Sequence, residues 1–258
     1  MTALALAGDG GTIHYQRIAG AADRPCLVFL HEGLGCVAMW KDFPQRLCAT
    51  TGCAGLLYDR IGYGHSSPLV KPRSIHYLHE YALIELPQVL AQLLPDRDYV
   101  VIGHSDGGSI GLIHSAARPE RLRALITIAA HSFVEPETLA GIDRADAAFA
   151  SGKLKAALTR HHGDKTEATF RAWADTWRAD WYAGWNIESV LPAIACPTLI
   201  VQGEADEYAS RAQVDRPVAL IPGAEGRLLP GLKHSPHLEA PDTVVALATA
   251  FLAASGVC

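Results

Sequence analysis

The chain has 258 residues, of which 49% are hydrophobic and 19% are charged, and its formal net charge is −5. This length and composition predict a soluble globular chain with one extensive core. The weak negative charge and the lack of Lys or Arg runs argue against nucleic acid and anionic membrane surfaces as partners, and no apolar stretch is long enough to span a membrane.

The N-terminal segment and the cysteines bear on location. The apolar run over residues 1–8 has no basic region before it, and Asp9-Gly-Gly11 ends it too early for a signal peptide. The six cysteines contain no Cys-x-x-Cys pair. We therefore expect reduced, structural cysteines and a cytoplasmic location. The sequence leaves open whether the protein is a monomer or a dimer.

The first half of the chain alternates strand and helix patterns. Residues 2–19 alternate around Asp9-Gly-Gly11, which predicts an antiparallel hairpin at a sheet edge. Continuous apolar runs predict buried strands at 26–30, 54–58, 99–103 and 124–130. Apolar residues at helical spacing predict helices at 37–49, 74–94 (with a kink at Pro87) and 107–117.

The second half begins where the alternation of strand and helix patterns stops. From His131 to about Leu191 the chain is helical, charged and rich in tryptophan, without a strand candidate. Strands are predicted again at 198–202 and 226–229, followed by a C-terminal helix capped by Asp242. The fold class is therefore α/β, with a mostly parallel, doubly wound sheet of about eight strands and a helical insertion after the sixth strand. The predicted domains are a core of residues 1–131 and 191–258 and an insertion of residues 132–190.

The most informative stretch is 99–108, where an apolar strand runs directly into a turn and a helix. Its Gly-x-Ser-x-Gly pattern at 103–107 is typical of a nucleophile elbow, a turn so tight that residues without side chains flank the serine. A second match at 107–111 overlaps the first, but Ser109 already lies in the predicted helix. We therefore predict that Ser105 is the nucleophile and that Ser109 is a helix residue.

A serine nucleophile needs a base that takes its proton and an acid that orients the base. Asp206 follows the strand at 198–202, and His234 follows the last predicted strand. Because both residues come after strands, they are predicted to lie in loops at the same edge of the sheet as Ser105. Nucleophile, acid and base thus occur in the order Ser, Asp, His along the chain.

With these residues the chain resembles the α/β-hydrolase superfamily over nearly its whole length. The residues after His131 match the place where members of that superfamily carry a cap. The resemblance implies the α/β-hydrolase fold with a helical cap, and a catalytic triad of Ser105, Asp206 and His234.

The resemblance also selects among neighbouring residues. Family spacing favours Asp206 over Glu204 and Glu207, which are expected to have surface roles. The family pattern of Gly, His, Pro and a later Glu-x-Pro favours His234 over His237, which is expected to pack or to form hydrogen bonds.

An oxyanion intermediate needs amide N–H donors. One donor is expected to be the amide of Asp106. By resemblance the second comes from the loop after the first buried strand, where many relatives read His-Gly-x-Pro-Gly and this chain reads His-Glu-Gly-Leu-Gly at 31–35. Aligned without a gap, Gly33 supplies the second donor.

Glu32 departs from this family pattern, because it stands where relatives have glycine. An acidic group beside an anionic intermediate is unfavourable unless it points away or is paired. One interpretation is that Glu32 braces the loop through Arg60 or Ser67. The alternative is a direct role in catalysis or in binding a substrate amine. Arg60 belongs to a Gly-rich segment, Asp-x-x-Gly-x-Gly-x-Ser at 59–66, which Ser67 follows directly. This segment resembles the family's and shapes one side of the pocket.

Four tryptophans recur at four-residue intervals in the insertion: Trp173, Trp177, Trp181 and Trp185. On one helix they would form a single stripe that packs the insertion onto the core, with one or two of them lining the substrate pocket. The candidate pocket residues are Glu32, Leu34, His104, Trp173, Trp177 and Trp181. The remaining histidines, His161-His162 and the group His65, His76 and His79, lack further ligands at metal spacing, so we expect no metal site.

These residues predict a serine hydrolase that needs no cofactor and cleaves a small carboxylic ester, or a lactone or amide, through an acyl-enzyme. The expected partner is a small ester-like molecule. Carbon–carbon bond hydrolysis, lyase or cofactor-free peroxidase chemistry on the same triad stays open, as does a ligand-binding receptor on this fold. Proline iminopeptidases are disfavoured, because their His-Gly-Gly-Pro-Gly loop and their tryptophan-containing elbow are missing.

Overall fold

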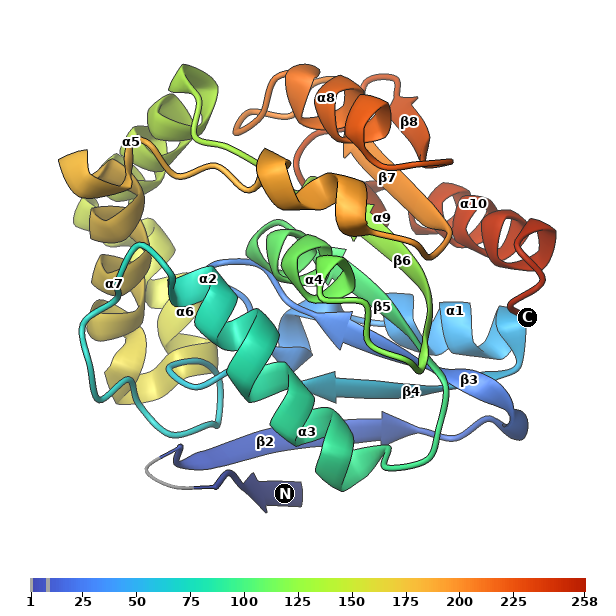
Figure 1. Cartoon of the computed structure of the whole chain (residues 1–258). Coiled ribbons are helices and arrows are strands. Elements are labelled where there is room, and N and C mark those ends of the chain that lie inside the picture. Colours follow the sequence, from blue (N-terminus) through green and yellow to red (C-terminus); the bar gives the residue numbers. More distant parts are fainter. Residues whose placement is uncertain (1, 8–9) are drawn as a thin grey trace.

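The computed structural model describes residues 2–7 and 10–258. Within them, eight strands form one sheet in the order β1-β2-β4-β3-β5-β6-β7-β8 (Figure 1). The strands are β1 (Thr2–Ala5), β2 (Thr12–Ile18), β3 (Ala21–Leu30), β4 (Cys53–Tyr58), β5 (Tyr99–His104), β6 (Leu122–Ile128), β7 (Thr198–Gly203) and β8 (Glu225–Leu229). Strands β3 to β8 run parallel, so the predicted mostly parallel sheet is confirmed.

The predicted N-terminal hairpin lies at one edge of this sheet. β1 pairs antiparallel with β2, with Leu4 opposite Ile13, and β2 pairs antiparallel with β4. Of its predicted turn, Asp9 lies outside the described residues. The hairpin therefore forms the edge of the sheet opposite β8.

Helices cover both faces of the sheet, because residues along the central strands alternate between two apolar cores. Leu27 and Phe29 of β3 point to the face covered by α1 (Phe43–Thr51) and α10 (Pro241–Ala254). Val28 and Leu30 point to the other face. That face carries α2 (Tyr77–Glu80), α3 (Leu86–Leu93), α4 (Asp106–Ala116) and α8 (Ala212–Leu220). The central strands are thus buried on both sides, as their continuous apolar runs predict.

Three predicted helices differ from the observed ones. The helix at 37–49 is a 3₁₀ turn (Val37–Trp40) followed by α1, because Lys41 between them has φ of 53°. The helix at 74–94 consists of α2, a π turn (Tyr81–Glu85) and α3. Pro87, at the start of α3, has no N–H to donate to the carbonyl four residues back, and the wider turn precedes it. Asp242 lies inside the first turn of α10 and pairs with Arg46; it does not cap the helix.

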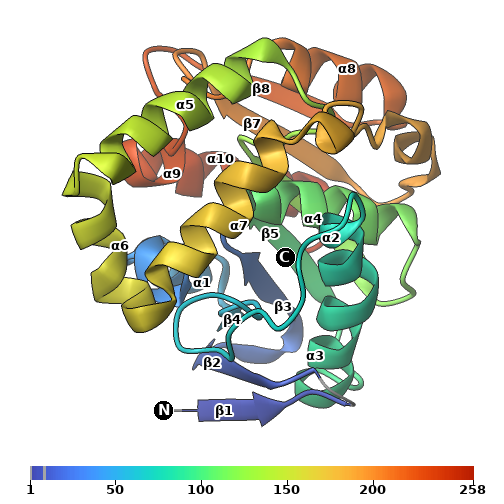
Figure 2. The ribbon, with the colours of Figure 1, turned by 90° about the vertical axis from the view of Figure 1, so that its left-hand side faces the viewer.

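Three α-helices lie between β6 and β7: α5 (Pro136–Ala150), α6 (Lys153–His162) and α7 (Thr166–Arg178). Figures 1 and 2 show them together beyond the carboxyl ends of β3 and β4. Short 3₁₀ turns follow α6 and α7, at Gly163–Lys165, Asp180–Tyr182 and Glu188–Ala193, and α9 (Pro236–Glu239) precedes α10. The division into core and cap stays a prediction.

The expected single stripe of four tryptophans is wrong. α7 ends at Arg178, and Ala179 is extended with ψ of 136°, so only Trp173 and Trp177 share a helix. Trp181 lies in the following 3₁₀ turn with half of its surface exposed, and Trp185 is buried. A regular spacing of four residues keeps side chains on one face only while the helix continues.

Two further features concern the whole chain. All six cysteines are free thiols. Within the described residues, no helix combines the length and the apolar character needed to cross a membrane.

Candidate active site

The turn between β5 and α4 presents Ser105 with strained backbone angles, φ 52° and ψ −119°. Both flanking glycines are required. A Cβ on Gly103 would lie 2.2 Å from the carbonyl oxygen of Gly107, and a Cβ on Gly107 would lie 1.9 Å from the carbonyl oxygen of Leu30. The amide of Ser105 donates to the carbonyl of Ile128 at the end of β6, at 2.8 Å. The sequence pattern and this geometry both describe an elbow that exposes one hydroxyl.

The overlapping motif match places Ser109 within α4. Its side chain is fully buried and its hydroxyl donates to the carbonyl of His131 at 2.6 Å. Ser109 therefore ties the elbow helix to the chain after β6, and its hydroxyl does not face the cavity that contains Ser105.

The structure brings Ser105, His234 and Asp206 together. His234 Nε2 lies 3.0 Å from Ser105 Oγ, and Nδ1 lies 2.9 and 3.0 Å from the two carboxylate oxygens of Asp206. Because the carboxylate accepts the Nδ1 proton, Nε2 is left to accept a proton from the serine. The Asp206 carboxylate is inaccessible to solvent, and the amide of Tyr208 also donates to its Oδ1 at 2.8 Å, which fixes the carboxylate beside the imidazole.

The pKa of His234 is raised above its usual value. Burial alone would lower the pKa, but the hydrogen bond and charge of Asp206, helped by the carboxylates of Glu207 and Glu32, outweigh it. These carboxylates favour the imidazolium, which is the form that a base reaches after it takes a proton.

The rival residues have other environments. His237 packs against Trp40, Phe43 and His104, and burial together with the charge of His234 lowers the pKa of His237 to about 3. Glu204 is exposed. Glu207 is exposed too, as expected, but it also lines the cavity beside Ser105, and its carboxylate accepts the amide of His234 at 3.3 Å.

The two predicted oxyanion donors lie in the wall of the same cavity. Gly33 and Asp106 both line it with Ser105, and neither amide donates a hydrogen bond to another group in the described part of the chain. A Cβ on Gly33 would lie 2.4 Å from Nε1 of Trp173, so the indole edge packs directly on the loop. Within the described residues, both amides are therefore left without an acceptor.

Arg60 holds the loop that carries Gly33. Its side chain is fully buried, and the guanidinium donates to the carbonyls of His31 and Glu32. The amide of Arg60 donates to Nε2 of His31 at 3.1 Å. His31 in turn donates from Nδ1 to the carbonyl of Glu32 at 2.8 Å. Burial is the main cause that lowers the pKa of His31, and the charge of Arg60 lowers it further. The ring therefore stays neutral, so one nitrogen can accept a hydrogen bond and the other can donate one.

The carboxylate of Glu32 braces its own loop. It accepts the amide of Leu34 at 3.0 Å, whereas Arg60 binds the main-chain carbonyl of Glu32 and the Ser67 hydroxyl accepts the amide of Thr12. The bracing interpretation thus has the right function but different partners. Burial raises the pKa of Glu32, and the hydrogen bond from Leu34 opposes that shift.

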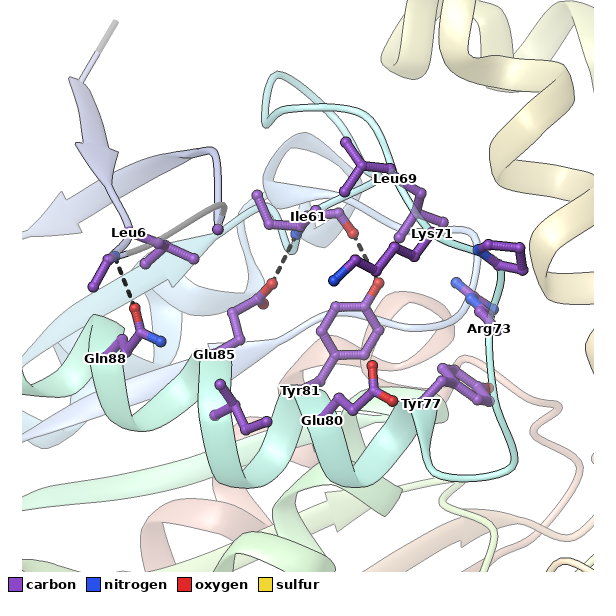
Figure 3. Close-up of a pocket in the computed structure, with 15 residues that line it drawn as sticks. Leu6, Ile61, Leu69, Lys71, Arg73, Tyr77, Glu80, Tyr81, Glu85 and Gln88 are labelled. Atoms are coloured by element: carbon purple, nitrogen blue, oxygen red, sulfur yellow. Dashed lines mark hydrogen bonds between the residues drawn. The ribbon is translucent and has the colours of Figure 1, made fainter.

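Two side chains of the π turn, Tyr81 and Glu85, bind the main chain of Ile61, the residue after Arg60 (Figure 3). Glu85 accepts the amide of Ile61 at 3.0 Å, and Tyr81 donates to the carbonyl of the same residue at 2.8 Å. Burial raises the pKa of Glu85 to about 8, although Ile61 and Arg60 act to lower it. These side chains line a hollow of about 430 Å³ whose lining contains none of the residues around Ser105.

The cavity at Ser105 has a volume of about 260 Å³. Of the predicted pocket residues, Glu32, Leu34, His104, Trp173 and Trp177 line it. Trp181 does not, because it lies beyond the end of α7 and is exposed; that prediction is wrong.

Sequence reasoning missed several lining residues. They are Met39, His131, Thr138, Ile142, Leu154, Leu158, Glu207, Tyr208 and Ser235. Two of them carried a usable signal, since His131 and Tyr208 follow the carboxyl ends of β6 and β7, where site residues gather in α/β sheets. The Tyr208 ring lies 4.7 Å from the His234 ring between centroids.

The cavity is mostly apolar, and its lining includes acidic residues. Its carboxyl groups are those of Glu32, Asp106 and Glu207, and no Lys or Arg is among its lining residues. In the described ranges, no group of three or more His, Cys, Asp or Glu side chains could hold a metal ion. The arrangement is therefore suited to nucleophilic attack on a small uncharged or positively charged molecule.

The chain is similar to known proteins over most of its length. The sequence profile of the alpha/beta hydrolase family matches residues 27–247. The chain is 28% identical over 263 residues to Serine hydrolase BPHL of Mus musculus, covering 98% of this chain and 87% of the mouse protein. It is also 27% identical over 276 residues to a proline iminopeptidase of Lactobacillus helveticus, covering 90% and 92% of the two chains.

Solved structures share the fold. A carboxylesterase from Nitrososphaera gargenis superimposes with a TM-score of 0.76 over 99% of each chain at 22% identity. The enol-lactonase of Burkholderia xenovorans LB400 gives a TM-score of 0.74 at 20% identity, covering 98% of this chain and all of the other. With the match of the family profile over most of its length, the chain belongs to the alpha/beta hydrolase family.

Proposed function

We propose that the protein is a cofactor-independent serine hydrolase that cleaves small carboxylic esters through an acyl-enzyme. The observation that carries this proposal is the continuous hydrogen-bonded chain from Ser105 Oγ through His234 to Asp206. The chemistry of each group follows from its neighbours, because a serine hydroxyl becomes a nucleophile only when a base accepts its proton.

In the first step His234 Nε2 takes the proton of Ser105 as Oγ attacks the carbonyl carbon of the ester. The imidazolium that forms is stabilised by Asp206, and the amides of Gly33 and Asp106 bind the oxyanion. His234 then gives its proton to the leaving alcohol, and the carbon–oxygen bond to that alcohol breaks. Water, deprotonated by the same imidazole, releases the acid and restores Ser105.

The size and charge of the cavity restrict the substrate. A volume of about 260 Å³ accommodates a short acyl group, and the walls are mostly apolar. The carboxyl groups of Glu32, Asp106 and Glu207 would repel a substrate that carries a carboxylate. Neutral or amine-bearing esters are therefore the preferred class, and lactones and amides of the same size are less favoured.

Residues 132–190 are proposed to form a cap over this site. Ile142, Leu154, Leu158, Trp173 and Trp177 come from α5, α6 and α7 and line the cavity with Ser105. These side chains define the apolar part of the pocket, so they would determine which acyl groups fit.

A second candidate is removal of an N-terminal residue from a peptide or an amino-acid amide. Glu32 and Glu207 favour it, because their carboxylates could bind an α-amino group near Ser105. The name of the relative from Lactobacillus helveticus, a proline iminopeptidase, supports this class of substrate. The missing His-Gly-Gly-Pro-Gly loop argues against proline as the residue removed.

Turnover of p-nitrophenyl acetate and of a set of amino-acid p-nitroanilides, proline among them, would distinguish these candidates. We expect ester hydrolysis that is abolished by Ser105→Ala and retained by Ser109→Ala, the variant at the overlapping motif. Faster cleavage of an anilide than of any ester would favour the peptidase. Tight binding of ligands without turnover would favour a receptor and contradict the proposal.

A further inference from the structure

A buried histidine of the inserted helices reaches the loop that carries Gly33. His162 is the last residue of α6 and is 3% exposed. Its Nε2 donates to the carbonyl of Leu34 at 2.8 Å, and its Nδ1 accepts the amide of Gly64 at 3.0 Å. Because an amide N–H can only donate and a carbonyl can only accept, the two contacts fix one neutral tautomer.

The two partners of His162 belong to the two loops that shape the site. Leu34 follows Gly33, and its amide is bound by the Glu32 carboxylate. Gly64 has φ of 45° and lies in the segment that contains Arg60, which binds the carbonyls of His31 and Glu32. One imidazole thus joins both loops to α6.

The inserted residues make further polar contacts with the Arg60 segment, besides those of Arg144 with the carbonyl of Glu207 and of Ala172 with Arg73. Lys165 Nζ donates to the carbonyls of Gly64, at 2.7 Å, and of Ser66, and Thr169 Oγ1 donates to the carbonyl of Gly62 at 2.8 Å. Within the described residues, His162 makes the one hydrogen bond from α5–α7 to residues 31–35. The oxyanion loop is therefore linked to these helices by polar contact at a single point.

We propose that His162 is a positioning residue. Through its two hydrogen bonds, the position of the inserted helices determines the orientation of the Gly33 amide. The proposal rests on the serine-hydrolase function above. It assigns His162 a role in holding an oxyanion donor, although its ring does not line the cavity at Ser105. The sequence alone suggested only a solvent or core position for His162.

The surroundings of His162 suit this role. The titratable and charged groups around it are His31, Asp59, Tyr63, His161 and Lys165. Burial is the largest influence and lowers the pKa of His162, although the hydrogen bond to Leu34 opposes that shift. The ring is therefore neutral near pH 7, as an acceptor for Gly64 must be.

Asparagine and glutamine can separate the two contacts. In His162→Asn the amide oxygen stands near the position of Nδ1, so it can accept from Gly64 but cannot reach Leu34. In His162→Gln the amide nitrogen can reach the position of Nε2 and donate to Leu34. His161→Asn is the matched control, because His161 is the adjacent residue on α6 and makes neither contact.

The experiment measures kcat and KM for p-nitrophenyl acetate, the inhibition constant of a phenylboronic acid, and the melting temperature of each variant. Removal of one oxyanion donor typically costs on the order of 10²–10³ in kcat, so a donor that is retained but loosened should cost about tenfold. We expect His162→Asn to lose about tenfold in kcat and in boronate affinity, with KM unchanged. His162→Gln should recover most of that loss.

Two results would overturn the inference in an ester-hydrolysing wild type. One is a kcat for His162→Asn equal to that of His161→Asn. The other is an equal loss in the Asn and Gln variants that only follows their melting temperatures, which would mean a purely structural residue. If the wild type hydrolyses no ester, the proposed function itself fails.

Discussion

His104, the residue before the nucleophile, donates a hydrogen bond from Nε2 to the main-chain carbonyl of His234 at 2.9 Å. Burial is the main reason that the pKa of His104 is far below its usual value, so the ring is neutral and has one proton to donate. The elbow thus holds the loop of the proposed base as well as presenting Ser105.

This contact predicts the effect of His104→Phe. The phenyl ring retains the packing against Trp40 and His237 but cannot donate to the loop. A hydrogen bond of this kind contributes about 1 kcal/mol, so kcat should fall about fivefold while KM changes little. Steady-state kinetics on p-nitrophenyl acetate test the effect, and an unchanged kcat in a folded variant would show that His234 keeps its place without His104.

A second prediction concerns the pH profile. The base must be neutral to accept a proton, so kcat/KM should rise as the pH passes upward through the raised pKa of His234. Glu207 contributes to that raised pKa through its charge, so Glu207→Gln should move the rise to lower pH. Rates measured from pH 5 to pH 9 would reveal the shift. Movement of the rise to higher pH would contradict the electrostatic account.

A third prediction distinguishes Asp206 from its neighbour. Asp206→Asn should lower kcat by about 10³-fold to 10⁴-fold, because the imidazole loses both its tautomer and its charge partner. Glu204→Gln is the matched control at an exposed position and should change kcat less than twofold. Comparable losses in both variants would indicate that Asp206 is not the acid of the triad.

A fourth prediction concerns the oxyanion loop. A Cβ on Gly33 would meet the Trp173 indole at 2.4 Å, so Gly33→Ala should displace the loop or the indole and lower kcat about 100-fold. Gly184→Ala is the control, because a Cβ there meets no atom within 4 Å. A Gly33→Ala variant with full activity would mean that this loop does not supply the donor.

A fifth prediction is a loss of stability between about pH 4.5 and pH 8 that depends on Glu85. The pKa of Glu85 is about 8 in the folded chain and near 4.5 when unfolded, so the folded state holds the extra proton between these values. Stability from this group is therefore present at acid pH and declines as the pH rises from about 4.5 to 8.

Glu85→Gln should remove that decline, which amounts to a few kcal/mol at most, because the amide keeps an acceptor for Ile61 without a charge. Melting temperatures at pH 5, 6, 7 and 8 check the effect. Glu80→Gln, on the preceding turn and exposed, is the control. The same slope in the wild type and in Glu85→Gln would disprove the link.

The sheet could be predicted because its signal is local. Apolar runs such as 99–103 are buried on both faces, and each is followed by a helix pattern, which requires a parallel sheet. Ser105, Asp206 and His234 could be placed because residues after parallel strands gather at one edge. Neither inference needs knowledge of distant side-chain contacts.

Other parts of the structure could not be predicted, because no local sequence pattern indicates them. No glycine or proline marks the end of α7 at Arg178, so the spacing of Trp181 was misleading. The hydrogen bond from His162 to Leu34 joins residues 128 positions apart, and no sequence pattern in either segment indicates it. The partner of the Glu32 carboxylate was missed because it is a main-chain amide in its own loop, which any residue type except proline could provide.

The most direct test of the account is the mass of the intact protein after reaction with a fluorophosphonate, followed by mapping of the labelled peptide. The account predicts one adduct per chain on Ser105, none in Ser105→Ala, and labelling that is strongly slowed in His234→Ala. Labelling that persists in Ser105→Ala, or an adduct on Ser109, would contradict it.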